Sequence, residues 1–146
     1  MYTSTLIVHS LLRWLALVLG AMAIVHTLRA RSVHTRAALG FVIALDVQLL
    51  LGILLYVAIS PTVHAALASM PAAMHHRGLR FWAVEHPTLA VGAVIAAHVG
   101  RVVARKRGGA RGVRALVFAF ALALVLLVLA TPWPFLAHGR PWFRFA

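Results

Sequence analysis

Two histidines, His9 and His86, lie inside two membrane-length apolar stretches, each about two helical turns from the same membrane face. A helix rises about 1.5 Å per residue, which puts His9 about 12 Å and His86 about 10 Å from the middle of its stretch. Ionisable residues at such depth are costly, so a functional role with a partner is the default interpretation. Two imidazoles at matching height on neighbouring helices suit the two axial positions of a haem iron. We therefore expect a bis-histidine haem between these stretches.

Two charged residues accompany the histidines. Arg13 follows His9 by one turn, and Glu85 directly precedes His86. A buried arginine favours a carboxylate in bidentate geometry, which haem propionates would supply. Glu85 is the alternative partner of Arg13, and it could instead pair with Arg80 or accept a proton from the His86 ring or from a quinol. Polar packing without a cofactor, or a different ligand, is the alternative for the two histidines themselves.

A second pair of histidines lies toward the opposite membrane face. His26 is about 13 Å and His98 about 7 Å beyond the middle of their stretches. The pair could bind a second haem and carry electrons across the membrane. The two heights differ by about 6 Å, however, and each residue is rotated by about 100° or more from the first histidine of its helix. A position at the lipid headgroups is the simpler interpretation of His26.

Asp46 lies near the middle of a third apolar stretch, where an unpaired aspartate costs on the order of 3 kcal/mol. By height its best partner is His98, and this pair could be structural or a step in a proton path. Gln48, Gly52 and Tyr56 follow at four-residue spacing and share one helix face. This stripe predicts the lining of a haem or quinone pocket, with hydrogen bonds between helices as the alternative.

The composition identifies the class of protein. Of the 146 residues, 63% are hydrophobic and only 11% are charged, with a mean hydropathy of +0.95, whereas a soluble domain carries roughly a quarter charged residues. The sequence is that of an integral membrane protein. It contains no cysteine, which excludes disulfides, iron–sulfur clusters and thiolate or covalent haem attachment. The net charge of +12 indicates topology signals and lipid contacts rather than nucleic-acid binding.

Four stretches are long enough to cross a bilayer, which requires about 20 apolar residues. We expect an all-α bundle with transmembrane helices at about residues 6–28, 37–59, 81–104 and 113–130. Small residues recur on the faces of both histidines and would let the first and third helices pack closely against each other. These stripes are Ala16, Gly20, Ala23 and Thr27 after His9, and Ala90, Ala93, Ala97, Gly100 and Ala104 after His86.

Basic residues concentrate in two connections, residues 29–36 and 101–114. By the positive-inside rule both connections are cytoplasmic. Both termini and the loop over residues 60–80 would then face the periplasmic side of a bacterial inner membrane.

The C-terminal segment, residues 131–146, differs in kind from the spans. Its three prolines prevent a continuous helix. Aromatic and basic side chains alternate in it as in an interfacial belt. A membrane-surface anchor is the simplest interpretation, and a lid over a site on the outer face or a docking strip for a partner are the alternatives. These side chains are Trp133, Phe135, Arg140, Trp142, Phe143, Arg144 and Phe145.

Four motifs spread over nearly the whole chain carry a resemblance to a known family. They are His9-Ser-x-x-Arg13-Trp14, the segment Gln48–Tyr56, Glu85-His86-Pro87 with the preceding Phe81-Trp82, and Pro132-Trp133-Pro134-Phe135. Together they resemble small bacterial four-helix membrane proteins that are commonly described as cytochrome b or cytochrome b-like. The resemblance implies haem b bound by His9 and His86.

Electron transfer is the function that these expectations favour. Two histidine ligands leave no open position on the iron, which suits electron transfer better than oxygen chemistry or a stand-alone enzyme. A quinol or a partner cytochrome would supply the electrons. Two other classes stay open: a non-catalytic subunit of a larger respiratory or photosynthetic membrane complex, and a small proton or solute transporter that uses Asp46 and His98.

Overall fold

Residues 1–143 can be described in the computed structural model, and they form helices joined by short turns, followed by a non-helical segment after residue 130. Arg144 and Phe145 of the predicted aromatic belt lie outside the described residues. Within residues 1–143, four helical segments are long and apolar enough to cross a membrane, and there is no strand. The predicted all-α class with four membrane-length helices is confirmed, and these helices indicate a multi-pass membrane protein.

The four segments contain the four predicted stretches and extend beyond them at one or both ends. The third segment also includes the short helix α5, described below. The segments are α1 (Tyr2–Ala30), α2 (Arg36–Leu54) continued by the π-helical turn η1 (Leu55–Ile59), α6 (His86–Arg107) preceded by the π-helical turn η2 (Phe81–Glu85), and α7 (Gly109–Ala130).

Local chemistry accounts for the two turns at one end of the bundle. The Thr35 side chain begins α2 by accepting a hydrogen bond of 3.1 Å from Ala38 N. Gly108 and Gly109, between α6 and α7, have φ angles of 61° and 47°. Residues without a Cβ adopt this left-handed region at little cost. The Gly-Gly sequence therefore permits α7 to reverse direction directly after α6.

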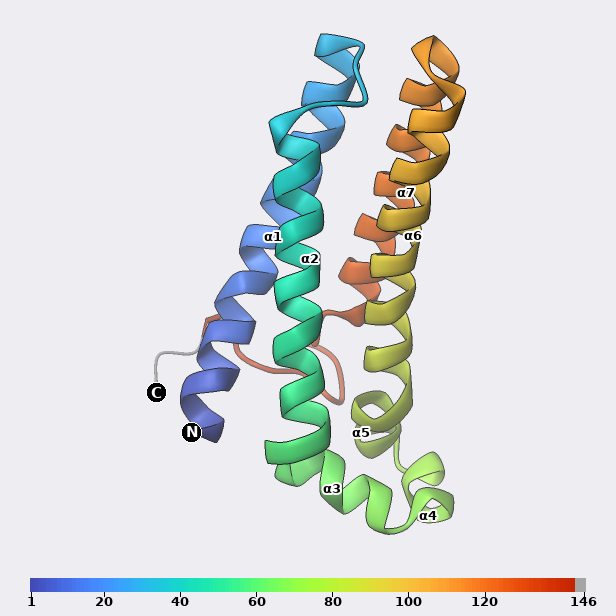
Figure 1. The fold of residues 1–146 in the computed structure, drawn as a ribbon. Helices are drawn as coiled ribbons and strands as arrows, with labels where there is room; N and C mark the ends of the chain where they lie inside the picture. Colours follow the sequence, from blue (N-terminus) through green and yellow to red (C-terminus); the bar gives the residue numbers. More distant parts are fainter. Residues whose placement is uncertain (144–146) are drawn as a thin grey trace.

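The connection between the second and third spans is helical rather than an open loop. It forms α3 (Pro61–Ala68), α4 (Met70–His75) and α5 (Arg77–Arg80). Ser60 Oγ accepts a hydrogen bond from Val63 N, and a proline lies in the first turn of both α3 and α4, where its missing N–H has no helical partner to lose. These short helices cover one end of the bundle (Figure 1), which is called the α3 end below.

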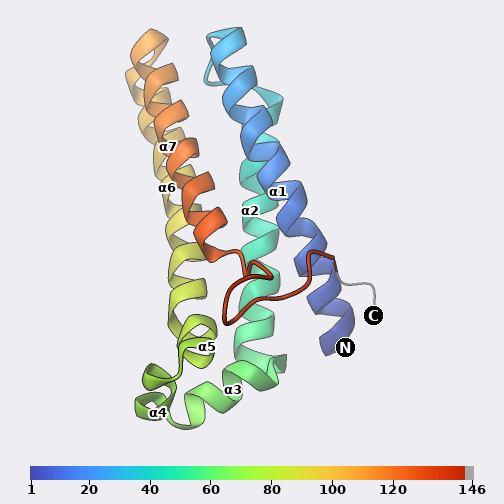
Figure 2. The ribbon, with the colours of Figure 1, turned by 180° about the vertical axis from the view of Figure 1, so that it is seen from behind.

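The long helices form two antiparallel hairpins, α1 with α2 and α6 with α7 (Figure 1). Seen from behind, α7 lies beside α1, while α2 lies beside α6 (Figure 2). α7 stops short of the α3 end, whereas α1, α2 and α6 continue toward it. The C-terminal segment leaves the end of α7 and crosses below it toward α1.

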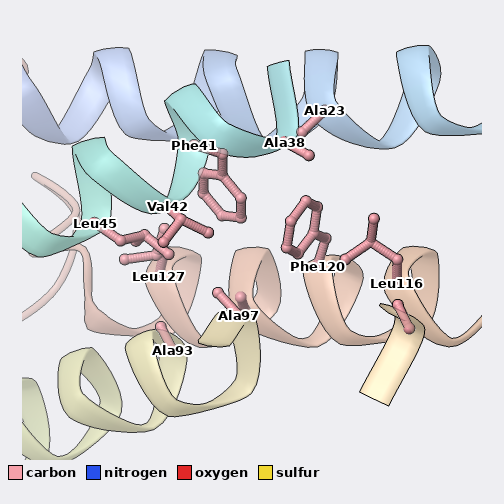
Figure 3. Close-up of a cluster of buried hydrophobic side chains, with 12 residues drawn as sticks. Ala23, Ala38, Phe41, Val42, Leu45, Ala93, Ala97, Leu116, Phe120 and Leu127 are labelled. Carbon is pink, nitrogen blue, oxygen red and sulfur yellow. The ribbon is translucent and has the colours of Figure 1, made fainter. Parts of the chain in front are cut away.

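The core joins the two hairpins around a pair of aromatic rings. Phe41 of α2 and Phe120 of α7 are fully buried, and their rings meet edge to face with centroids 5.1 Å apart (Figure 3). Leu45 and Leu116 extend the contact to either side. Large apolar side chains such as Val18 and Ile95 instead point outward and are more than half exposed. Small residues inside and large apolar residues outside are typical of a bundle surrounded by lipid.

The small-residue stripes are buried, but their partners differ from the expected ones. A Cβ added to Gly20 of α1 would lie 2.6 Å from Leu124 of α7, and one added to Gly100 of α6 would overlap Ala119 of α7. The stripe of α6 therefore packs on α7, and the stripe of α1 packs on α7 and α2, rather than on each other. The expected direct packing of α1 on α6 was wrong because α7 separates these helices along most of their length.

Candidate functional site

An apolar cavity of about 230 Å³ opens where α7 ends. α7 stops at Ala130 and the chain becomes extended at Thr131, so nothing helical separates α1 from α6 beyond this level. Side chains from α1, α2, η1, η2, α6 and the C-terminal segment line the space. The cavity therefore results from the difference in length between α7 and its neighbours.

His9 and His86 face each other at this cavity. Their ring centroids are 6.2 Å apart and their planes are inclined at 68°. Both side chains are partly buried and belong to the cavity wall. The two histidines singled out by their matching heights are thus brought together, across the gap that the end of α7 leaves open.

The His86 ring has a defined tautomer. Its Nδ1 lies 2.8 Å from the carbonyl oxygen of Ala130, and since a carbonyl can only accept, Nδ1 carries the proton. Ala130 is the last residue of α7, so its carbonyl has no partner within the helix. Phe81 and Trp82 pack against the ring, with centroids 5.8 and 5.4 Å away. The lone pair of Nε2 in the neutral ring remains free to bind a metal.

The His9 ring contacts the amide of Gln48. Gln48 Nε2 donates to the His9 carbonyl oxygen at 3.0 Å and lies 3.3 Å from His9 Nε2. His9 Nδ1 and Gln48 Oε1 are buried and have no hydrogen-bond partner among the described residues. Orphaned polar atoms of this kind are rare in folded proteins and call for an explanation such as a ligand or an unusual role. Gln48, predicted as a pocket residue, is therefore the neighbour that positions His9.

Gly52 makes room for the His9 ring. A Cβ added to Gly52 would lie 3.4 Å from His9 Cε1, at the inner limit of ordinary contact. A side chain larger than that of alanine would collide with the imidazole. Gly52 lines the same cavity one turn after Gln48, as its four-residue spacing predicted.

Tyr56 stabilises the irregular start of the third span. Pro87 has no N–H, so the carbonyl of Ala83, four residues earlier, lacks its usual helical donor. The Tyr56 hydroxyl donates to this carbonyl at 2.9 Å. The π-helical turn that contains Ala83 also shifts the bonding register, with His86 N donating to Phe81 O. Tyr56 lines the cavity, and its visible role is to fix the segment that presents His86.

The two charged neighbours take different positions. Arg13 lines the cavity, where its Nη2 makes only long hydrogen bonds, 3.5 Å to Ser10 Oγ and 3.4 Å to the Trp142 carbonyl. Its Nε is buried without a partner in the described part of the chain. Glu85 is not among the cavity residues, and its carboxylate pairs with Arg80 at 2.7 Å. Of the two arginines predicted as partners of Glu85, Arg13 and Arg80, the structure therefore shows the pair with Arg80.

The C-terminal segment forms part of the cavity wall. The carbonyl oxygen of Trp142 accepts a hydrogen bond of 3.0 Å from Trp14 Nε1, and the two indoles stack with centroids 5.9 Å apart. His138 stacks on Phe81 with centroids 3.5 Å apart. Arg140 lines the cavity, with its guanidinium carbon 5.2 Å from the centre of the Trp82 ring. The segment thus has the arrangement of a lid rather than of a surface anchor alone.

The second pair of histidines does not meet. His98 Nε2 is 2.8 Å from Asp46 Oδ1, the predicted pair between α6 and α2. His26 is exposed on α1, and within residues 1–143 no contact joins it to His98. The geometry accordingly gives no support to a second haem. Residues 1–143 also contain no cluster of three or more His, Cys, Asp or Glu side chains that could hold a metal ion alone.

No protein-family model, curated protein or solved structure shows significant similarity to this chain. The site must therefore be interpreted from its own geometry.

Three features of the site were not predicted from the sequence. The Ala130 carbonyl is backbone, and its position depends on where α7 ends. Arg140 reaches the cavity, and His138 reaches Phe81, only because the C-terminal segment folds back. One signal was present for Arg140: the chain has 14 Lys and Arg but two acidic side chains, so most arginines need other partners.

Proposed function

We propose that this chain binds one haem b between His9 and His86 and transfers electrons in a membrane. The observation that carries the proposal is the His86 ring, which lines the cavity and whose Nδ1–H donates to the Ala130 carbonyl, so that the lone pair of Nε2 stays available. Histidines that bind metals commonly donate their other N–H to a carbonyl or carboxylate, which fixes the ring and raises its basicity.

The separation of the rings supports the same pair of ligands. A transition metal binds an imidazole nitrogen at about 2 Å, and the ring centre lies about 1 Å behind that nitrogen, so two axial imidazoles have centres about 6 Å apart. The observed separation is 6.2 Å. For His9 to bind through Nε2, Gln48 must release its 3.3 Å contact with that atom, while it keeps the 3.0 Å bond to the His9 carbonyl.

The size of the cavity limits how a tetrapyrrole would be held. Pockets for molecules of drug size usually measure about 300–1,000 Å³, and this cavity measures about 230 Å³. To hold a haem ring, the cavity would therefore have to widen; Gln48 and Ile53 of α2 and Val91 and Val94 of α6 are among the residues that line it. Haem b, once bound, supplies one-electron redox chemistry.

Charge supports an orientation in a bacterial inner membrane. Arg29 and Arg31 lie at the C-terminal end of α1, and Arg105–Arg107 form the last turn of α6. Both helices end on the side of the bundle opposite α3 (Figure 1). The positive-inside rule assigns this end to the cytoplasm. The cavity and both termini would then face the periplasm, where a quinol or a partner cytochrome would exchange electrons. The resemblance to small cytochrome b-like membrane proteins agrees with this proposal.

Two alternatives have a specific basis. The exposed aromatic residues Phe135 and Phe143 would suit an accessory subunit that docks on a larger membrane complex. The Asp46–His98 pair, with side chains 43% and 49% exposed in the single chain, would suit a transporter of protons or solutes. The two side chains form a hydrogen bond with each other that links α2 to α6. A structural role therefore explains the pair without transport.

A haemin titration of the detergent-purified protein tests the proposal. The wild type should give the spectrum of six-coordinate low-spin haem b, with a sharp α band on reduction. His86→Ala should lose this spectrum, whereas His26→Ala, an exposed histidine on α1, should retain it. A wild-type chain that binds no haemin, or a His86→Ala variant with the wild-type spectrum, would contradict the proposal.

A further inference from the structure

Two arginines at the cavity have no acidic partner within the chain. Asp46 and Glu85 are its only acidic side chains, and they pair with His98 at 2.8 Å and with Arg80 at 2.7 Å. Arg13 and Arg140 both line the cavity, and neither contacts a carboxylate in the part of the chain that the structure describes. Positive charge therefore accumulates at an apolar space without an internal counter-ion.

The contacts that Arg13 and Arg140 do make leave donors available. Arg13 makes two hydrogen bonds of 3.4 and 3.5 Å, and its Nε is buried with none. The guanidinium of Arg140 lies over the Trp82 ring at 5.2 Å, a contact that uses its charge and not its N–H groups. A guanidinium carries five N–H donors arranged to match a carboxylate.

The C-terminal segment adds Arg140 to the cavity that Arg13 also lines. Trp142 accepts from both Trp14 Nε1 and Arg13 Nη2 through its carbonyl oxygen, at 3.0 and 3.4 Å. Arg140 lies two residues before Trp142, and its backbone N donates to Pro132 O at 3.1 Å, which closes a compact loop. Gly139 is required in this loop, since an added Cβ would lie 2.8 Å from the Pro134 carbonyl oxygen. The loop therefore holds Arg140 at the cavity, over the Trp82 ring.

We infer that Arg13 and Arg140 form a carboxylate-binding site at the cavity, which the C-terminal segment completes by supplying Arg140. The ligand is an amphiphile with an apolar body for the cavity and carboxylate groups for the arginines. Two sources offer this chemistry, the propionates of a tetrapyrrole and the headgroup of a free fatty acid. For the tetrapyrrole, the inference rests on the proposed function, whereas the arginine site stands on its own contacts.

The test compares ligands that differ only in their carboxylates. Haemin, haemin dimethyl ester and oleate are titrated into the detergent-purified full chain, as wild type, Arg140→Gln and Arg13→Gln. Arg77→Gln is the matched control, because Arg77 is exposed in the connection on the same end of the bundle. Binding is followed by absorbance for the haems and by quenching of tryptophan fluorescence for oleate.

We expect wild type to bind haemin about tenfold or more tightly than the dimethyl ester, as befits loss of a charge-assisted hydrogen bond. Arg140→Gln and Arg13→Gln should each reduce this preference, and Arg77→Gln should not. Equal binding of haemin and its ester by wild type, together with oleate binding that is unchanged in Arg140→Gln, would overturn the inference.

The same titrations separate this inference from the proposed function. Haemin that gives the low-spin spectrum but is bound as well as its ester would leave the histidine ligands standing and overturn the arginine site for propionates. Oleate binding that depends on both arginines, with no haemin binding, would support the arginine site with a fatty-acid ligand and contradict the haem proposal. Retained folding of each variant is checked by circular dichroism and gel filtration.

Discussion

At the scale of single residues, the site depends on how His9 and His86 are held. The Ala130 carbonyl holds the His86 ring by a hydrogen bond. Gln48 holds His9 by a hydrogen bond to its carbonyl oxygen, and Gly52 leaves room for the His9 ring. Their shared height could be predicted from the sequence, because helix rise alone sets it. The spacing of Gln48 and Gly52 also predicted them as pocket residues, whereas the Ala130 carbonyl could not be predicted, because a backbone acceptor leaves no pattern in residue types.

Gly52 provides a direct test of the space around His9. Gly52→Ala should be tolerated, since its Cβ would lie 3.4 Å from His9 Cε1. Gly52→Leu should displace the imidazole and weaken haemin binding about tenfold or more, the effect expected when a ligand moves by a fraction of an ångström to an ångström. Gly40→Leu is the control, because the nearest atom to its Cβ is Leu19 Cδ2 at 4.0 Å. Equal affinities for the two leucine variants would show that Gly52 does not shape the site.

At the scale of elements, irregular backbone positions the histidine of the third span. The π-helical turn η2 precedes His86, and Pro87 removes the donor for Ala83, so the Tyr56 hydroxyl takes its place. π-Helical turns often occur at functional sites. The compensation by Tyr56 was visible only in the structure.

A double-mutant cycle tests this compensation. Tyr56→Phe should destabilise the protein by about 1–3 kcal/mol, the usual result of leaving a buried carbonyl unpaired. In a Pro87→Ala background the restored backbone N–H can donate to Ala83, so Tyr56→Phe should cost clearly less. Thermal unfolding in detergent measures both effects, with Tyr2→Phe as the control. Additive effects of the two substitutions would refute the shared role of Tyr56 and Pro87.

The C-terminal segment should bind to the bundle in a pH-dependent manner through His138. Burial against Phe81 lowers the pKa of His138 below its usual value near 6.5, an effect that Glu85 partly opposes. The released segment therefore binds a proton more readily than the docked one. Docking should be complete above about pH 6.5 and weaken as the pH falls below it.

Fluorescence quenching measures this docking, because the rings of Trp14, Trp133 and Trp142 contact one another where the segment meets α1. Acrylamide should quench the tryptophans more at pH 5 than at pH 8 in the wild type. His138→Phe keeps an aromatic ring on Phe81 without a titrating group, so its quenching should not depend on pH. A His138→Phe variant with the pH dependence of the wild type would rule out His138 as the cause.

At the scale of the whole molecule, one difference in helix length creates the cavity. The four spans and the all-α class could be predicted from apolar length alone. The prediction that α1 packs directly on α6 was wrong, because small residues permit close approach without specifying the partner helix. α7 occupies that place along most of the bundle, and its end at Ala130 leaves the gap in which His9 and His86 meet.

We propose that one haem b occupies this gap, held by His9 and His86. The most direct measurement is a pyridine haemochrome assay of haem per chain, on protein purified from membranes of cells grown with a haem precursor. We predict about one haem b per wild-type chain and loss of that haem in the His9→Ala, His86→Ala double variant. Purified wild-type protein without haem, or a double variant that keeps it, would contradict the account.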